Sequence, residues 1–306
     1  MNLAHVFAEV AWTVLLPIFL LIGLGFGLGR AFKLDANTMN KLNLYALGPA
    51  LIFTKFLHSS LTLADAGRIT VFLLALALLM WLVSAASCAV ARVRKGDRSA
   101  VHMAAMFANT GNYGIPAAEL AFGAAGVAIQ AVVMAAQDLI FFSLGLFVAG
   151  GGPAQARRAL ASTARMPFLY AIALALILRT ADTALPAPLD SALALLGQGL
   201  VPVALLTLGA QLAASPVPSP RRELSLAVFL RLVVSPLVAL PLAQALGFSG
   251  MMAAVLVVGA AFPAAVNTAL IAIEFRRGAV LASSAVVVTT LLSALTVTLA
   301  IALARI

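Results

Sequence analysis

The chain has 306 residues, of which 63% are hydrophobic and only 9% are charged, and its formal net charge is +9. So little polar material cannot cover a soluble globule, which indicates a polytopic membrane protein. The positive charge does not indicate a nucleic-acid partner, because the basic residues lie in short clusters between apolar stretches. Cys88 is the only cysteine and the histidines are scattered, so no internal disulfide, metal site or cofactor is expected.

The apolar stretches predict an all-α protein with ten transmembrane helices. The first stretch lacks the basic start of a cleaved signal peptide, so it is expected to remain as a span. No charge occurs between Leu232 and Ile273, a run too long for one crossing of about 20 residues, so this run is divided at residues 247–250. The expected spans are residues 10–29, 38–58, 69–91, 99–122, 126–150, 167–178, 191–212, 224–246, 251–274 and 279–304.

These ten spans predict two repeats of five helices. Residues 1–150 would form the first repeat, residues 151–165 a linker, and residues 166–306 the second repeat. Because five is odd, the second repeat would enter the membrane inverted relative to the first. Most of the 19 lysines and arginines fall in loops after odd-numbered spans, and the positive-inside rule makes such loops cytoplasmic. Both termini are therefore expected on the periplasmic side of a bacterial cytoplasmic membrane.

A polar cluster interrupts the fourth expected span. Residues 108–116 combine two amides, a hydroxyl, two glycines and a proline within a stretch otherwise suited to hydrocarbon. An unsatisfied polar group in hydrocarbon costs several kcal/mol, so such a cluster is expected to face protein or a hydrated cavity. The candidate substrate-binding residues here are Asn109, Thr110, Asn112 and Pro116.

A second cluster interrupts the ninth expected span at a corresponding position. Paired interruptions in matching spans of two halves indicate the midplane site of an inverted-repeat transporter. A helix end freed there would direct backbone N–H groups and a partial positive charge at an anion. The alternative is that these polar side chains only form hydrogen bonds between packed helices. The candidates in this cluster are Pro263, Asn267 and Thr268.

Other residues are singled out because they are unusual inside a span. Asp138, beside Gln137, is the only acidic residue deep in an expected helix, and an intramembrane carboxylate is a candidate proton or coupling site. The alternative is a structural carboxylate held by a basic side chain or by its neighbours. Arg231 is expected to snorkel to an interface or to form a pair. Pro49 and Pro202 are expected to break two further helices that face the substrate.

Several of these motifs resemble the auxin efflux carrier family, which includes the plant PIN-formed carriers and bacterial transporters of malonate and other small organic acids. The fourth-helix motif is Asn109-Thr110 followed by Gly114-Ile115-Pro116 and Gly123. The resemblance extends over essentially the whole chain, through residues 42–53, 201–212 and 231–236.

The resemblance implies a fold like that of bile-acid symporters, with broken helices four and nine crossing near the midplane. It implies a scaffold of helices 1, 2, 6 and 7, a transport domain of helices 3–5 and 8–10, elevator-type movement and a homodimer. It places Pro116 at the break of helix four, with Asn109 and Asn112 as neighbouring polar contacts. In the ninth helix Pro263 matches, while the second proline of the plant carriers corresponds to Asn267.

Alternative functions remain open at this point. An intramembrane serine protease is disfavoured, because every histidine precedes Ser249 of the Gly-Phe-Ser-Gly sequence. A channel or a receptor needs no further residues, and a sodium-coupled carrier related to bile-acid symporters shares the expected architecture. The favoured function is transport of a small carboxylate such as malonate, without sodium.

Overall fold

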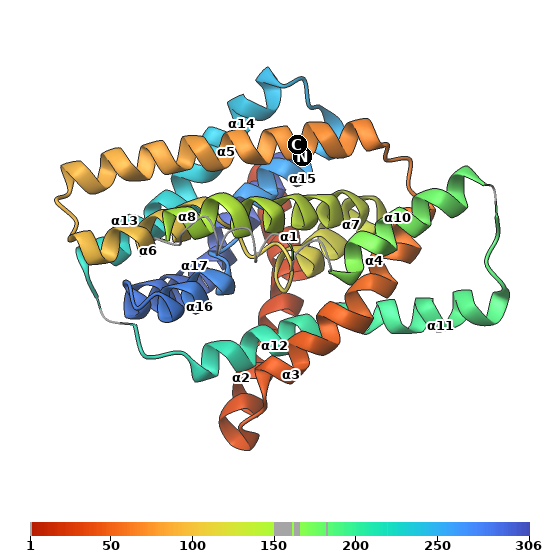
Figure 1. Ribbon diagram of the computed structural model, residues 1–306, viewed down its shortest axis with the longest axis horizontal. Helices are drawn as coiled ribbons and strands as arrows, with labels where there is room; N and C mark the ends of the chain where they lie inside the picture. The colour runs from red at the N-terminus through yellow and green to blue at the C-terminus, as the bar shows by residue number, and fades with distance from the viewer. Residues whose placement is uncertain (1, 150–160, 162–165, 182, 219) are drawn as a thin grey trace.

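The computed structural model describes residues 2–149, 161, 166–181, 183–218 and 220–306, and these are helical apart from turns and one isolated β-bridge (Figure 1). Two shorter apolar helices, α10 (Pro167–Thr180) and α15 (Gly250–Ala260), accompany six longer helical stretches. The expected linker at residues 151–165 lies outside the described residues apart from residue 161. The six stretches apolar and long enough to cross a membrane are Leu3–Phe32, Leu63–Val90, Gly114–Val148, Ala187–Ala214, Arg222–Ala245 and Ala279–Ala304.

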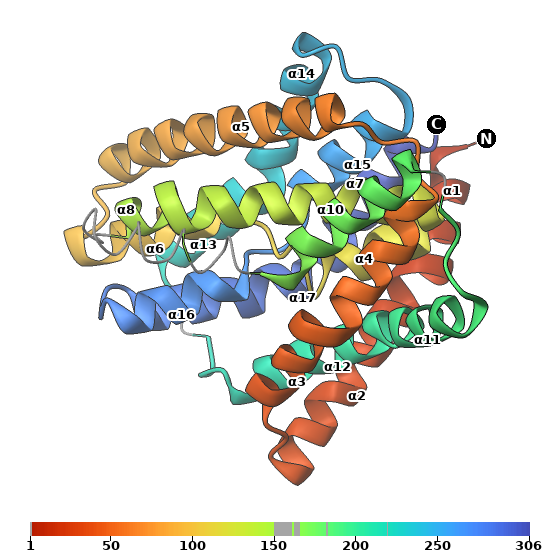
Figure 2. The same ribbon diagram turned by 45° about the vertical axis from the view of Figure 1, so that its right-hand side comes forward.

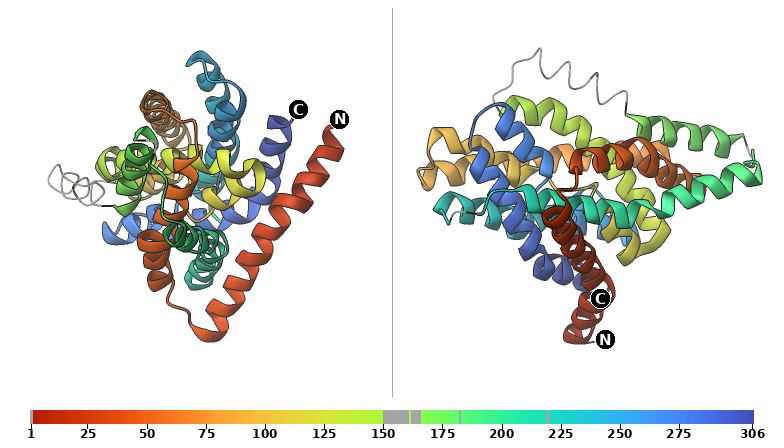
Figure 3. Two further views of the ribbon diagram at one scale, coloured as in Figure 1. Left: turned by 90° about the vertical axis from the view of Figure 1, so that its right-hand side faces the viewer. Right: turned by 90° about the horizontal axis from the view of Figure 1, so that it is seen from below.

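The first 57 residues contain two helical stretches. The first is built from α1 (Leu3–Val10), a π-helical turn η1 (Ala11–Leu15) and α2 (Leu16–Phe32), and it forms a long rod along one side of the molecule (Figure 3). The second is built from α3 (Ala36–Leu42), a π-helical turn η2 (Asn43–Leu47) and α4 (Gly48–Leu57). The start of the first span is therefore seven residues earlier than the sequence predicts.

Three of the π-helical turns have a common cause. The turn η1 ends two residues before Pro17, η2 two residues before Pro49, and η4 (Leu230–Val234) two residues before Pro236. A proline has no N–H and its ring collides with the carbonyl four residues earlier. Widening the preceding turn relieves that collision, so the helix continues past the proline instead of ending.

The middle of the chain contains α5 (Leu63–Val90), α6 (Lys95–Met106) and α7 (Gly114–Ile140), and α7 continues through η3 (Phe141–Gly145) into α8 (Leu146–Val148). Thr62 and Asp65 form a reciprocal capping box at the start of α5. The backbone of α7 leaves the helical region at Gly123, where φ is 64°. This kink lies at the boundary that the sequence predicts between the fourth and fifth spans.

The second half continues with α11 (Ala187–Gln198) and α12 (Leu200–Ala214), which are separated only at Gly199. It ends with α13 (Arg222–Phe229), η4, α14 (Ser235–Ala245), α15, α16 (Val266–Glu274) and α17 (Ala279–Ala304). Gly247, between α14 and α15, and Gly250, the first residue of α15, both have positive φ, so the long apolar run is divided at residues 246–249, close to where the sequence predicts. The termini lie at the same end of the molecule, where Arg305 approaches Glu9 to 3.7 Å (Figure 2).

The helices pack in two groups. One group consists of α2, α3, α4, α10, α11 and α12. The other consists of α5 to α8 and α13 to α17, and α1 contacts this second group through α17. Helices α4 and α12 of the first group lie against α7 of the second. The two groups therefore meet along α7.

The contact between α2 and α12 depends on glycines that allow the two backbones to touch. A Cβ added to Gly25 would lie 2.7 Å from Leu206 Cα, and one added to Gly209 would lie 2.6 Å from Phe26 N. A Cβ on Gly27 would meet no atom within 4 Å. Helix α2 contains two overlapping GxxxG pairs, Gly23 with Gly27 and Gly25 with Gly29, and only the second pair faces α12.

We expect Gly25→Ala to destabilise the protein and Gly27→Ala to leave it as stable as the wild type or slightly more stable. The added methyl at Gly25 meets the backbone of Leu206, which cannot move aside, and such overpacking costs about 1–3 kcal/mol. The measurement is the thermal unfolding midpoint of the purified protein in detergent. Equal midpoints for the two variants would contradict this packing.

Candidate functional site

Two helical interruptions lie directly against each other and hydrogen-bond through their backbones. The first follows α6, and the second separates α15 from α16. An antiparallel β-bridge joins Ala108 to Ala264. The Asn109 N–H donates to the Pro263 carbonyl at 2.8 Å, and the Ala265 N–H donates to the Phe107 carbonyl at 3.0 Å. The two polar clusters found in the sequence are thus brought together.

The proline expected at the first break lies just beyond it. The interruption runs from Phe107 to Tyr113, and Pro116 is the third residue of the following helix α7. A proline is tolerated in a first turn because the N–H groups there have no intrahelical acceptor. The expectation that Pro116 itself is the break is therefore corrected: it marks the helix start. Pro263, in contrast, lies within the second interruption.

The two interruptions, residues 107–113 and 261–265, form a crossing that side chains from neighbouring helices hold in place. Gln137 of α7 accepts from the Ala108 N–H at 3.3 Å and donates to the Ala108 carbonyl at 2.8 Å. It also donates to the Thr110 hydroxyl at 3.1 Å. Thr289 of α17 accepts from the Ala264 N–H at 3.0 Å. The side-chain amide of Gln137, a predicted coupling residue, is thus hydrogen-bonded to residues of the crossing.

A cavity of about 240 Å³ lies beside the crossing, between the two helix groups. Ile115 of α7 and Val266 of α16 line it where those helices begin, so two helix N-termini face the same space. Their partial positive charges suit an anion, and no lysine or arginine lines the cavity in the described part of the chain. The residues predicted from the sequence that line it are Pro49, Asn109, Thr110, Asn112, Gln137, Asp138 and Asn267.

Four predicted site residues do not line this cavity. Thr268 is fully buried and its hydroxyl donates to the Ala265 carbonyl at 2.6 Å, so it satisfies the backbone at the start of α16. Pro116 and Pro263 shape the two chain breaks. Pro202 lies in the first turn of α12, away from the cavity lining. The structure thus separates residues that face the cavity from residues that form its frame.

The polar groups of the cavity wall are mostly amides. The Asn109 Nδ2 is buried and has no hydrogen-bond partner among the described residues. Asn112 Nδ2 donates to Asn40 Oδ1 at 3.3 Å, across the boundary between the two helix groups. Asp138 is half-buried and is the only charged side chain that the described lining contains. It makes no hydrogen bond or ion pair to the described residues.

Sequence reasoning missed three amide residues on the opposite wall. Asn40, Asn43 and Gln211 line the cavity from α3, η2 and α12. Asn43 donates to the Thr207 hydroxyl at 3.2 Å. That hydroxyl in turn donates to the Val203 carbonyl at 2.6 Å, which fixes the orientation of the Asn43 amide. All three are amides within expected spans, so the criterion that identified Asn109 could have identified them too.

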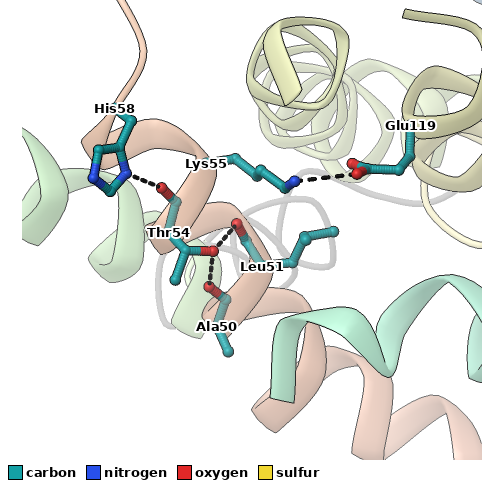
Figure 4. A network of polar contacts seen from close by, with 6 residues as sticks. All are labelled: Ala50, Leu51, Thr54, Lys55, His58 and Glu119. Carbon is teal, nitrogen blue, oxygen red and sulfur yellow. Dashed lines mark hydrogen bonds and ion pairs between the residues drawn. The ribbon is translucent and has the colours of Figure 1, made fainter. Parts of the chain in front are cut away.

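An ion pair lies just beyond the residues that line the cavity. Ile52 and Ile115 line the cavity, and one turn further along the same helices Lys55 lies 3.1 Å from Glu119 (Figure 4). The two side chains are 27% and 30% exposed. Such a pair contributes at most about 1 kcal/mol, because water competes for both charges. It joins α4 of the first helix group to α7 of the second.

Taken together, the apolar helices and the paired interruptions define a multi-pass membrane protein with a polar cavity between two helix groups. The family model described as "Membrane transport protein" matches residues 10–158 and 154–301. The chain therefore belongs to this membrane transport family, the auxin efflux carrier family. It is 27% identical to an "Uncharacterized transporter" of Methanothermobacter thermautotrophicus over 283 residues, which cover 91% of this chain and 93% of that protein.

Proposed function

We propose that the protein is a secondary transporter that carries a small organic anion, with malonate-like dicarboxylates as the first candidates, across the bacterial cytoplasmic membrane. The observation that supports this most directly is the unpartnered buried amide of Asn109, which lies in a cavity faced by two helix N-termini. Amides and helix ends bind carboxylates without a buried lysine or arginine in the wall. Membership of a membrane transport family agrees with this proposal.

The proposed architecture has ten spans in two inverted repeats, with both termini periplasmic. In this scheme α6 with the start of α7 forms span four, and α15 with α16 forms span nine. The group containing α2, α4, α10 and α12 would serve as scaffold, and the group containing the crossing would move as an elevator-type transport domain. A homodimer formed through the scaffold is part of the proposal.

Counterflow of labelled malonate in proteoliposomes tests transport, because it requires a site that opens alternately to each side, which a receptor or an enzyme lacks. We expect Asn109→Ala and Asn112→Ala each to raise the half-saturating concentration about tenfold or more, since each removes an amide worth roughly 1.5 kcal/mol to a charged ligand. Asn37→Ala, an exposed amide outside the cavity, is the matched control. Unchanged affinity in both cavity variants would contradict the site.

We propose Asp138 as the group that couples transport to protons, because it is the one carboxylate in the described cavity wall. A deprotonated Asp138 would repel an anionic substrate, so binding should accompany its protonation. We expect Asp138→Asn to retain counterflow while uptake no longer responds to an imposed pH gradient. Asp190→Asn, an exposed carboxylate on α11, should respond like the wild type. Persistent acceleration by the gradient in Asp138→Asn would exclude this role.

Elevator movement requires the Lys55–Glu119 pair to separate, because the two residues belong to different helix groups. In a Cys88→Ala background, we expect Lys55→Cys with Glu119→Cys to lose counterflow when a short bis-methanethiosulfonate, which forms a disulfide with each cysteine and releases methanesulfinate, links the two positions. Reduction of a cleavable linker should restore it. The single-cysteine variants treated with the same reagent are the controls, and full activity of the linked protein would argue against relative movement here.

A further inference from the structure

Arg231, for which the sequence predicts either snorkelling to an interface or pairing, lies deep inside the molecule. It belongs to the π-helical turn η4 and is 1% exposed. Its Nη1 donates to the Ala105 carbonyl at 3.1 Å. Its Nη2 donates to the Ser235 hydroxyl at 2.9 Å and to the Ala260 carbonyl. One guanidinium therefore binds both interrupted helices.

The two carbonyls belong to the last turns of the helices that lead into the crossing. Helix α6 ends at Met106 and α15 ends at Ala260, so Ala105 and Ala260 are among the residues whose carbonyls lack an intrahelical partner. A helix C-terminus also carries a partial negative charge. The fork of an arginine presents donors in several directions at once, which allows it to satisfy two helix ends together.

The charge of Arg231 has no carboxylate partner among the described residues. The ion pairs in that part of the chain are Lys55–Glu119 and Arg305–Glu9. Burying a charge costs several kcal/mol unless nearby groups compensate. Here the compensation comes from helix-end carbonyls and one hydroxyl, which carry only partial charges. Net positive potential therefore remains around the guanidinium.

This potential lies directly behind the wall of the substrate cavity. A small second cavity is lined by Arg231 together with Ala108, Thr110 and Gln137. The same three wall residues line the main cavity from the other side. Arg231 thus faces one side of the crossing while the two helix N-termini face the other.

We propose that Arg231 is the positioning residue of the anion site. Its guanidinium holds both helix C-termini so that the two N-termini meet at the cavity, and its positive charge strengthens anion binding through the wall without touching the ligand. This inference rests on the proposed transport of an organic anion for its ligand, while its structural part is independent of that proposal.

Hydrogen exchange of the purified protein tests the structural part without any ligand. We expect Arg231→Gln to raise amide exchange in residues 107–113 and 261–265 by about tenfold or more, and to leave α2 and α12 unchanged. Arg179→Gln is the matched control, because Arg179 also donates to two backbone carbonyls, those of Ser59 and Leu61, away from the crossing. Unchanged exchange in both segments of Arg231→Gln would overturn the proposal.

Ligand charge tests the electrostatic part. We expect Arg231→Gln to weaken malonate binding roughly a hundredfold and binding of its monoamide, malonamate, roughly tenfold, since the lost attraction scales with ligand charge. Arg231→Lys keeps the positive charge, so it should retain most of the wild-type preference for malonate over malonamate. Equal weakening of both ligands would overturn the electrostatic role. If Arg231→Gln does not fold, Arg231→Lys decides both parts: loss of the guanidinium fork should raise exchange in at least one of the two segments, and the retained charge should keep the ratio of malonate to malonamate affinity at its wild-type value. Unchanged exchange, or a changed ratio, would overturn the corresponding part. A wild type that binds neither ligand would contradict the proposed substrate, and the exchange result would still decide the structural role.

Discussion

The structure depends on the backbone hydrogen bonds that join the two helical interruptions. Within an apolar protein interior each unpaired N–H or C=O costs several kcal/mol, so one broken helix alone would be very unfavourable. Here Asn109 and Phe107 supply the groups that pair with Pro263 and Ala265. Each break is thus satisfied by the other. Neither interruption is expected to persist without its partner, and this couples the two halves of the chain.

The crossing also sorts the four helix ends by charge. The C-terminal ends of α6 and α15 are held together at Arg231, and the N-terminal ends of α7 and α16 face the main cavity. Gathering like ends buries partial charges of one sign, negative at the ends of α6 and α15 and positive at the starts of α7 and α16. One cation on the C-terminal side stabilises that arrangement, and on the other side the proposed anionic ligand would complete it. The same geometry therefore accounts for stability and for the proposed ligand class.

Residue types reveal much of this arrangement, but not which way each residue faces. Prolines, glycines and amides inside apolar runs predicted both interruptions and the break between α14 and α15, because those residues are costly in a continuous span. The sequence could not distinguish Gly25 from Gly27, since only the position of α12 decides which is buried. It could not place Arg231 either. A cation at the edge of an apolar run is expected at the membrane interface, and the carbonyls that accept its hydrogen bonds belong to two other helices. Nor could the sequence show that Thr268 lies off the cavity lining, with its hydroxyl bonded to the Ala265 carbonyl at the start of its own helix.

The contacts between helices differ in strength in a way that bears on movement. Helices α2 and α12 touch backbone to backbone through Gly25 and Gly209, a contact that leaves no room for sliding. The polar contacts of Lys55 with Glu119 and of Asn40 with Asn112 are part-exposed and join different helix groups. Water replaces such contacts at little cost, whereas a close-packed glycine contact has no substitute. Any relative movement of the two groups would therefore begin at these polar contacts rather than at the glycine contact.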